Sequence, residues 1–148
     1  LEDYFSYDVG FLYYDYPGMT DENTANGARN VDFFEYYGSL SLAVPNPVTD
    51  IGISYYYGYS PAGFQQDEYD YQNVSVEIAV PNTPFTISGS AGSTGSEMEG
   101  GNAYSDYMAS LSTTSAFGLD LGLSYTTIDG YGADVESDQV IFSIGKSF

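Results

Sequence analysis

The feature of this sequence that most constrains its fold is a period-two alternation of large apolar and small or polar side chains. In the last ten residues, QVIFSIGKSF, Val140, Phe142 and Ile144 alternate with Ser143 and Gly145. Successive side chains of a β-strand point to opposite faces of a sheet, so the pattern predicts a strand with one apolar and one small-polar face. Signals for helices are nearly absent, because good helix formers do not recur at helical spacing.

The same alternation recurs along the whole chain and is separated each time by residues typical of turns. The expected strands cover residues 4–16, 32–44, 51–59, 71–80, 85–92, 104–113, 119–128 and 139–148. The sequence therefore predicts an all-β fold, an antiparallel up-and-down meander of about eight strands. A length of 148 residues is enough for one domain, and we expect that domain to span residues 1–148.

Alternation alone does not separate a membrane barrel from a soluble β-sandwich, which alternates in the same way. The polar face of a sandwich is in water, where long charged side chains are expected, whereas here that face is mostly Ser, Gly, Ala and Thr. Its acidic residues are isolated: Asp8, Glu35, Glu77, Asp106 and Asp120. Small side chains suit the crowded or water-filled inside of a barrel, so this face favours the barrel.

The lengths of the links between the expected strands point the same way. Segments 17–30, 60–71, 92–103 and 129–138 are long, and they alternate with the short segments 45–50, 81–84 and 114–118. Outer-membrane barrels combine short periplasmic turns with longer extracellular loops, and their strands need ~9–11 residues to cross. The sequence therefore predicts a transmembrane β-barrel, or most of one, in a bacterial outer membrane.

Aromatic residues gather at both ends of the expected strands, as the interfacial girdles of a barrel do. The group beside the long links comprises Tyr14, Tyr16, Phe33, Phe34, Tyr57, Tyr59, Tyr69, Tyr71, Tyr104, Tyr107 and Tyr125. The group beside the short links and the terminus comprises Phe5, Phe85, Phe117 and Phe148.

Several segments in order along the chain resemble the TorF porin family of proteobacterial outer-membrane proteins. They are YDVGFLYYDYPG (7–18), FFEYYGSLSLAV (33–44), ISYYYGYSPAGF (53–64), YSDYMASLS (104–112) and VIFSIGKSF (140–148). Members of that family are longer at the N-terminus, so the resemblance implies the C-terminal part of a longer barrel. The alternating Phe142, Ile144 and Phe148 resemble the terminal-strand signature that such barrels present to their assembly machinery.

The charge and composition exclude several functions. The net charge is −19, with 21 acidic residues against Arg29 and Lys146, so the chain should repel the phosphates of nucleic acid. Without His or Cys it cannot build a Ser–His or Cys–His nucleophile. The Gly-rich segment 92–101 has no Lys and is therefore not a phosphate-binding loop. We expect neither an enzyme nor a resident cofactor.

The acidic residues are the candidate functional groups. Those in the long links that are candidate cation ligands are Asp67, Glu68, Asp70, Asp129, Asp134, Glu136 and Asp138. Oxygen ligands suit Ca²⁺ or Mg²⁺, but the spacing in DGYGADVESD is not that of a regular calcium loop, so diffuse attraction of cations is favoured. Asp8, Glu35, Glu77 and Asp120 would face a lumen and favour cations there. The alternative is that these four are hydrogen-bonded to Ser and Tyr and fill a closed interior.

The leading hypothesis is an outer-membrane β-barrel that works as a porin, with passive, cation-favouring diffusion of small solutes. The expected partners are outer-membrane lipid, the barrel assembly machinery and further copies of the chain. An alternative is an extracellular structural protein that self-assembles into rings or filaments through sheet edges and Tyr-rich faces. A third hypothesis is a soluble acidic sandwich that binds carbohydrate through Tyr.

Overall fold

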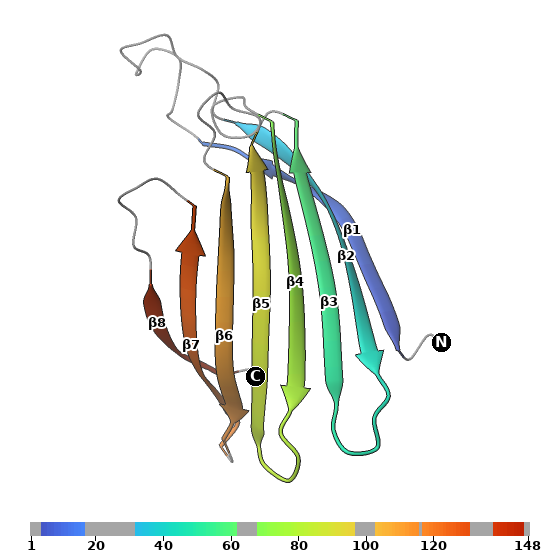
Figure 1. Ribbon diagram of the computed structural model, residues 1–148, viewed down its shortest axis with the longest axis vertical. Coiled ribbons are helices and arrows are strands. Elements are labelled where there is room, and N and C mark those ends of the chain that lie inside the picture. Colours follow the sequence, from blue (N-terminus) through green and yellow to red (C-terminus); the bar gives the residue numbers. More distant parts are fainter. Residues whose placement is uncertain are drawn as a thin grey trace.

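The computed structural model describes residues 4–16, 32–61, 68–96, 103–115, 117–130 and 138–146. They form one antiparallel sheet of eight strands in the order β1-β2-β3-β4-β5-β6-β7-β8 (Figure 1). The strands are β1 (Phe5–Tyr14), β2 (Phe33–Val44), β3 (Ile51–Ser60), β4 (Tyr69–Ala79), β5 (Phe85–Ser96), β6 (Tyr104–Thr114), β7 (Leu119–Asp129) and β8 (Gln139–Lys146). The predicted all-β meander is confirmed.

The ends of the strands follow the predicted links, with one extension. The short links all leave one end of the sheet, and the strand ends that border the long links lie at the other (Figure 1). The strand predicted for residues 85–92 continues to Ser96, where it pairs with Tyr69 of β4. Ladder hydrogen bonds with β4 therefore override the weak strand preference of this Gly- and Ser-rich stretch.

The two faces of the sheet differ in composition as predicted, and the apolar face is the exposed one. Tyr7 is 71% exposed, Val140 72% and Phe142 68%, and all three lie on the apolar face. Among the described residues the buried hydrophobic side chain is Phe33, at 8%, and the fully buried polar one is Ser60. Both lie on the polar face. The described strands form a single layer with no hydrophobic core on the apolar face.

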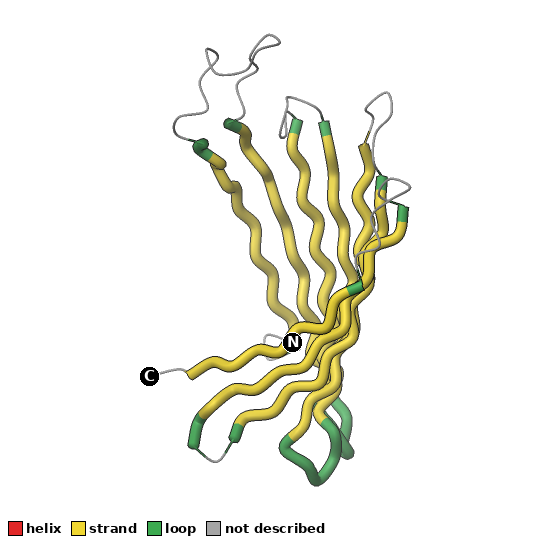
Figure 2. Tube along the Cα trace, turned by 90° about the vertical axis from the view of Figure 1, so that its left-hand side faces the viewer, coloured by secondary structure: helices red, strands yellow, loops and turns green. Residues whose placement is uncertain are grey.

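The sheet curls along its length (Figure 2), and contacts across its polar face indicate that this face is the concave one. Side chains of strands that are not neighbours meet on this face: Glu35 of β2 contacts Tyr69 of β4, and Tyr71 of β4 contacts Asp106 of β6. Such contacts cross a distance of roughly two strand spacings, ~9.5 Å, and are favoured when the sheet bends toward them.

The expected closure into a barrel is not present. Among the described strands β1 pairs with β2 alone and β8 with β7 alone, so they form an open trough. The register also offsets these two edges along the strand direction. The row of directly opposed residues that starts at Ser6 reaches Gln139, passing through Ser41, Ser54, Ser75, Ser90, Met108 and Thr126. From this row β1 runs toward the long links and β8 toward the short ones, so the edges lie at different heights.

The turn between β4 and β5 gives a test of the fold. Thr83 N donates to Val80 O at 3.2 Å, and Asn82 has a φ of 59° behind Pro81, the pattern of a type II turn. A β-branched residue is strained at this φ, whereas Gly is not. We expect Asn82→Val to lower the free energy of unfolding by about 1–2 kcal/mol in urea titrations of the detergent-folded chain. Asn82→Gly should leave it nearly unchanged, and equal effects of the two would contradict the turn.

Candidate functional site

The half of the polar face nearer the long links carries a group of aromatic and acidic side chains that we call the tyrosine–acid cluster. It comprises Asp8, Tyr14, Phe33, Glu35, Tyr37, Tyr56, Tyr69, Tyr71, Asn73 and Asp106. They come from β1, β2, β3, β4 and β6.

Glu35 is the carboxylate with the most hydrogen bonds in the tyrosine–acid cluster. The Tyr56 hydroxyl donates to Glu35 Oε1 at 2.9 Å, and the Tyr69 hydroxyl donates to Oε2 at 2.6 Å. Tyr69 lies on β4, two strands away from Glu35. Ser60 of β3 lies opposite Tyr69 and is fully buried, and its small side chain donates to Phe34 O at 2.7 Å. A small residue on the middle strand lets the side chains from the outer two strands meet above it.

Asp106 of β6 meets a tyrosine of β4 in the same way, and Gly92 is the small residue on β5 between them. The Tyr71 hydroxyl donates to Asp106 Oδ1 at 3.2 Å, and Asn73 Nδ2 donates to the Tyr71 oxygen at 3.1 Å. A Cβ at Gly92 would clash with both the Tyr71 hydroxyl and Asp106 Oδ2. Among the described residues, Asp106 Oδ2 is the buried side-chain oxygen with no hydrogen-bond partner.

The aromatic rings of the cluster contact one another across strands β1 to β4. Tyr14 and Phe33 stack with ring centroids 4.6 Å apart, and Tyr37 and Tyr56 stack at 6.0 Å. The Tyr37 hydroxyl lies 2.7 Å from the position that a Cβ of Gly10 would take. Gly10 therefore makes room for a ring of the neighbouring strand, as Gly92 does for Tyr71.

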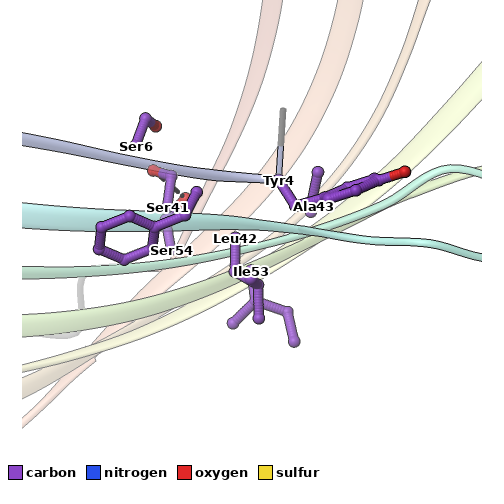
Figure 3. A pocket seen from close by; sticks show the side chains of 9 residues that line it. Tyr4, Ser6, Ser41, Leu42, Ala43, Ile53 and Ser54 are labelled. Carbon is purple, nitrogen blue, oxygen red and sulfur yellow. Dashed lines mark hydrogen bonds between the residues drawn. The ribbon is translucent and has the colours of Figure 1, made fainter. Parts of the chain in front are cut away.

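The other half of the polar face, nearer the short links, carries small side chains. Ser6, Ser41, Ser54, Ser75 and Ser90 lie in one row across five strands. Figure 3 shows Ser6, Ser41 and Ser54 gathered at a shallow hollow, with Ile53 on the opposite side of the strands. The Ser41 and Ser54 hydroxyl oxygens are 3.0 Å apart, and the Ser110 hydroxyl donates to that of Ser124 at 2.8 Å. This hollow offers hydroxyl groups without charge, so we assign it no chemistry of its own.

The four acids predicted to face a lumen all lie on the polar face, but far from one another. Asp8 and Glu35 belong to the tyrosine–acid cluster. Asp120 accepts from the Thr114 hydroxyl at 2.7 Å, and Glu77 lies between Gly52 and Ser88 of the neighbouring strands. Two of the four thus accept side-chain hydrogen bonds: Glu35 accepts from Tyr, as the alternative to a free lumen has it, and Asp120 accepts from Thr.

The predicted cation-binding acids are not brought together in the described part of the chain. Asp67, Asp134 and Glu136, and also Phe148, lie outside the described residues. Glu68 accepts from the Tyr59 hydroxyl at 3.0 Å. Asp138 directly precedes β8, and Asp70 and Asp129 lie near or at strand ends. Within the described ranges no three acidic residues are placed to hold a metal ion, so a Ca²⁺ or Mg²⁺ site stays a prediction.

The aromatic band predicted beside the long links is in part an inner cluster, which corrects the expectation of a girdle. Phe34, Tyr57, Tyr107 and Tyr125 are exposed on the apolar face, as a girdle requires. Tyr14, Phe33, Tyr69, Tyr71 and Tyr104 instead lie on the polar face by their strand register. The signal that separates the two sets is position parity: Tyr14 follows Tyr13 directly, so only one of them can point outward.

A family described as "Bacterial protein of unknown function (Gcw_chp)" matches the chain over residues 1–148. The chain belongs to this family. No curated protein and no solved structure matched the chain. The description of the Gcw_chp family names no activity, so function has to be argued from the two faces of the sheet. In the described part of the chain no helix is long and apolar enough to cross a membrane.

Gly92 gives a test of the tyrosine–acid cluster. We expect Gly92→Ala to lower the free energy of unfolding by about 1–3 kcal/mol, because the new methyl group displaces Tyr71 from Asp106. Gly89 of the same strand is the control, since its added Cβ would meet Met108 O at an ordinary 3.6 Å. Urea titration of both variants measures the difference, and equal losses would show that the close approach at Gly92 is unimportant.

Proposed function

We propose that this Gcw_chp protein is an outer-membrane β-barrel protein with a porin-like role, the passive and cation-favouring diffusion of small solutes. The observation that carries the proposal is the inverted burial of the sheet. Large apolar side chains are exposed on one face, while the buried Phe33 and Ser60 lie on the polar face. Water-soluble sheets show the opposite arrangement, and outer-membrane barrels show this one.

The exposed apolar face supports a location in lipid. It carries large apolar side chains on every strand, among them Phe11 at 67% and Ile144 at 64% exposed. A continuous apolar surface of this kind needs a cover, and lipid tails supply one along the length of all eight strands. The regular alternation of short and long links and the resemblance to the TorF porin family both support the same location.

The charges of the polar face support a preference for cations. Asp8, Glu35, Glu77, Asp106 and Asp120 lie on it, and in the described strands it carries no Lys or Arg. Lys146 falls on the apolar face by its alternation with Ile144. Rings of acidic side chains in a narrow polar path attract cations and repel anions. We propose no catalytic step, because the polar face presents carboxylates and hydroxyls without a nucleophile–base pair.

The half of the polar face nearer the short links and the tyrosine–acid cluster would play different parts in such a path. The row of Ser6, Ser41, Ser54, Ser75 and Ser90 leaves the short-link half wide, while the neighbouring rings of Tyr37, Tyr56 and Tyr71 narrow the long-link half. Hydrogen bonds from Tyr56 and Tyr69 hold Glu35 at the narrow part. We propose this narrow part as the place where solutes are selected. Phe142, Ile144 and Phe148 are proposed to be read by the barrel assembly machinery.

Ion selectivity in planar lipid bilayers tests the proposal. In a KCl gradient the chain should give a cation-selective reversal potential. A carboxylate ~10 Å from an ion in water stabilises a cation by about 0.4 kcal/mol and destabilises an anion by the same amount. Losing one carboxylate should therefore lower the cation/anion permeability ratio about fourfold. We expect this for Glu35→Gln and for Glu77→Gln. Glu68→Gln is the control, because Glu68 bonds Tyr59 of the apolar face and its loss removes the same charge away from the polar face.

Two results would contradict the porin role. Insertion into the bilayer without conductance would indicate a filled interior and a structural role in the membrane. Equal selectivity in Glu77→Gln and Glu68→Gln would show that the acids of the polar face do not line the path.

The open edges of the sheet favour a second candidate function, an extracellular structural protein that self-assembles. Within the described sheet, β1 and β8 each have one row of backbone groups without a strand partner, and such edges can join copies of a protein. Sedimentation with and without detergent separates the two functions. A barrel is monodisperse in detergent alone, whereas regular rings or filaments in plain buffer would favour self-assembly.

A further inference from the structure

The tyrosine–acid cluster is a floor of aromatic rings with carboxylates between them. We infer that this floor binds organic cations, molecules that carry a quaternary ammonium or guanidinium group, and that these are the solutes selected there. The inference rests on the proposed function for the passage of the solute, whereas binding to the rings requires no passage. It adds a chemical class of solute to the preference for positive charge.

The ring of Tyr37 lies flat on the backbone of the neighbouring strand. Its hydroxyl oxygen, Cζ and Cε1 are 2.7, 2.8 and 2.9 Å from the position that a Cβ of Gly10 would take. This position is off the ring plane, because a point in the plane equally far from these three adjacent atoms would be much closer to each of them. Tyr37 therefore turns one face of its ring to Gly10, and its other face points away from the sheet.

Two further rings lie over glycines in the same half of the polar face. The Tyr56 hydroxyl oxygen and Cε1 are 3.1 and 3.2 Å from the Cβ position of Gly58, which is buried. The Tyr71 hydroxyl lies over Gly92 of β5. A residue with a side chain at these glycines would lift the rings off the backbone, so the glycines are what allows the rings to form a floor.

The register and the spacing of the rings leave their outer faces accessible. Gly10, Tyr37, Gly58 and Tyr71 are directly opposed in one row across β1 to β4, so each ring has a glycine beside it in place of a second large side chain. The planes of Tyr37 and Tyr56 differ by 18° and their centroids are 6.0 Å apart. Nearly parallel rings at this spacing are offset, so neither covers the whole face of the other.

The carboxylates of the cluster give these ring faces a strongly negative surrounding. Asp8, Glu35 and Asp106 lie among the rings on β1, β2 and β6. Glu35 accepts from the Tyr56 and Tyr69 hydroxyls, and a hydroxyl polarised in this way leaves its ring richer in electrons. Asp106 Oδ2 is buried without a hydrogen-bond partner among the described residues, which points to a missing donor.

This combination of groups favours organic cations over inorganic ions. A cation above the face of a tyrosine ring is attracted by the ring quadrupole, and quaternary ammonium and guanidinium groups are recognised in this way. An inorganic divalent ion prefers several oxygen ligands at once. In the part of the chain that the structure describes, no three acidic residues are placed to hold such an ion.

The charge of the cluster also favours organic cations over neutral sugars. A sugar can stack on an aromatic ring, but it brings no charge to balance Asp8, Glu35 and Asp106. The polar face of the described strands carries no Lys or Arg that could balance these acids from within the protein. A ligand that is both positively charged and able to lie on a ring satisfies both features of the cluster.

Nuclear magnetic resonance of the chain folded in a polyoxyethylene detergent tests the inference, with tetramethylammonium ion as the probe. Protons above an aromatic face shift upfield, so the methyl signal should move upfield and the shift should saturate. The comparison is tert-butyl alcohol, a neutral molecule of nearly the same shape. We expect tetramethylammonium to bind at least about tenfold more tightly at low salt, because the carboxylates and ring faces attract only the cation.

Neighbouring tyrosines of β2 give matched variants. Tyr37→Leu removes a ring from the polar face and should weaken tetramethylammonium binding about 2–5-fold. Tyr36→Leu removes a ring from the apolar face, where Tyr36 is 53% exposed, and should leave the binding unchanged. Tyr37→Phe keeps the ring face and should bind the probe as the native chain does, which separates the loss of the ring from the loss of its hydroxyl.

Several results would overturn the inference. Equal binding of tetramethylammonium and tert-butyl alcohol would show that charge is not recognised. Displacement of the probe by an equal concentration of K⁺ would show diffuse attraction alone. Equal affinities in Tyr37→Leu and Tyr36→Leu would show that the ring floor takes no part, and binding of maltose without tetramethylammonium would indicate a sugar site.

The binding and the bilayer measurements fail separately. Tetramethylammonium binding without conductance would retain the organic-cation site and reject the porin role. Cation-selective conductance without tetramethylammonium binding would retain the porin role and reject the inference.

Discussion

The need to cover the apolar face is the constraint on which the rest of this structure depends. Alternation gathers large apolar side chains on one face of the sheet, and in the described part of the chain the eight strands have no second layer to bury them. In water such a face would drive aggregation, whereas in lipid it requires no protein partner. The polar face then becomes the inside of the molecule, and in the described sheet β1 and β8 are the outer strands.

The tyrosine–acid cluster is the polar counterpart of a hydrophobic core. In a sheltered interior a carboxylate is tolerated when donors surround it, and Glu35 receives hydroxyl donors from two strands. Small residues on the strand between, Ser60 and Gly92, make these contacts geometrically possible. The cluster therefore ties β2 to β4 and β4 to β6, and it does so with groups that also set the charge of the proposed path.

The sequence alone was enough to predict the strands and the composition of their two faces, because a period of two follows directly from strand geometry. The sequence did not predict the features that depend on contacts between strands. The extension of β5 to Ser96 depends on pairing with β4, and the meeting of Glu35 with Tyr69 depends on the curl of the sheet over Ser60. Position parity puts Tyr14 on the polar face, but it does not show that the ring stacks on Phe33 of the neighbouring strand. Whether β1 meets β8 depends on the sum of seven registers, which no local pattern encodes.

The most direct test of the central claim is a comparison of two single-tryptophan variants, since the chain contains no Trp. Leu123→Trp lies on the apolar face and Ser124→Trp on the polar face of the same strand, one residue apart. With the chain folded into vesicles that contain lipid brominated along its acyl chains, the fluorescence of Leu123→Trp should be strongly quenched and that of Ser124→Trp should not. Equal quenching of both, or none in either, would show that lipid does not cover the apolar face and would contradict the account.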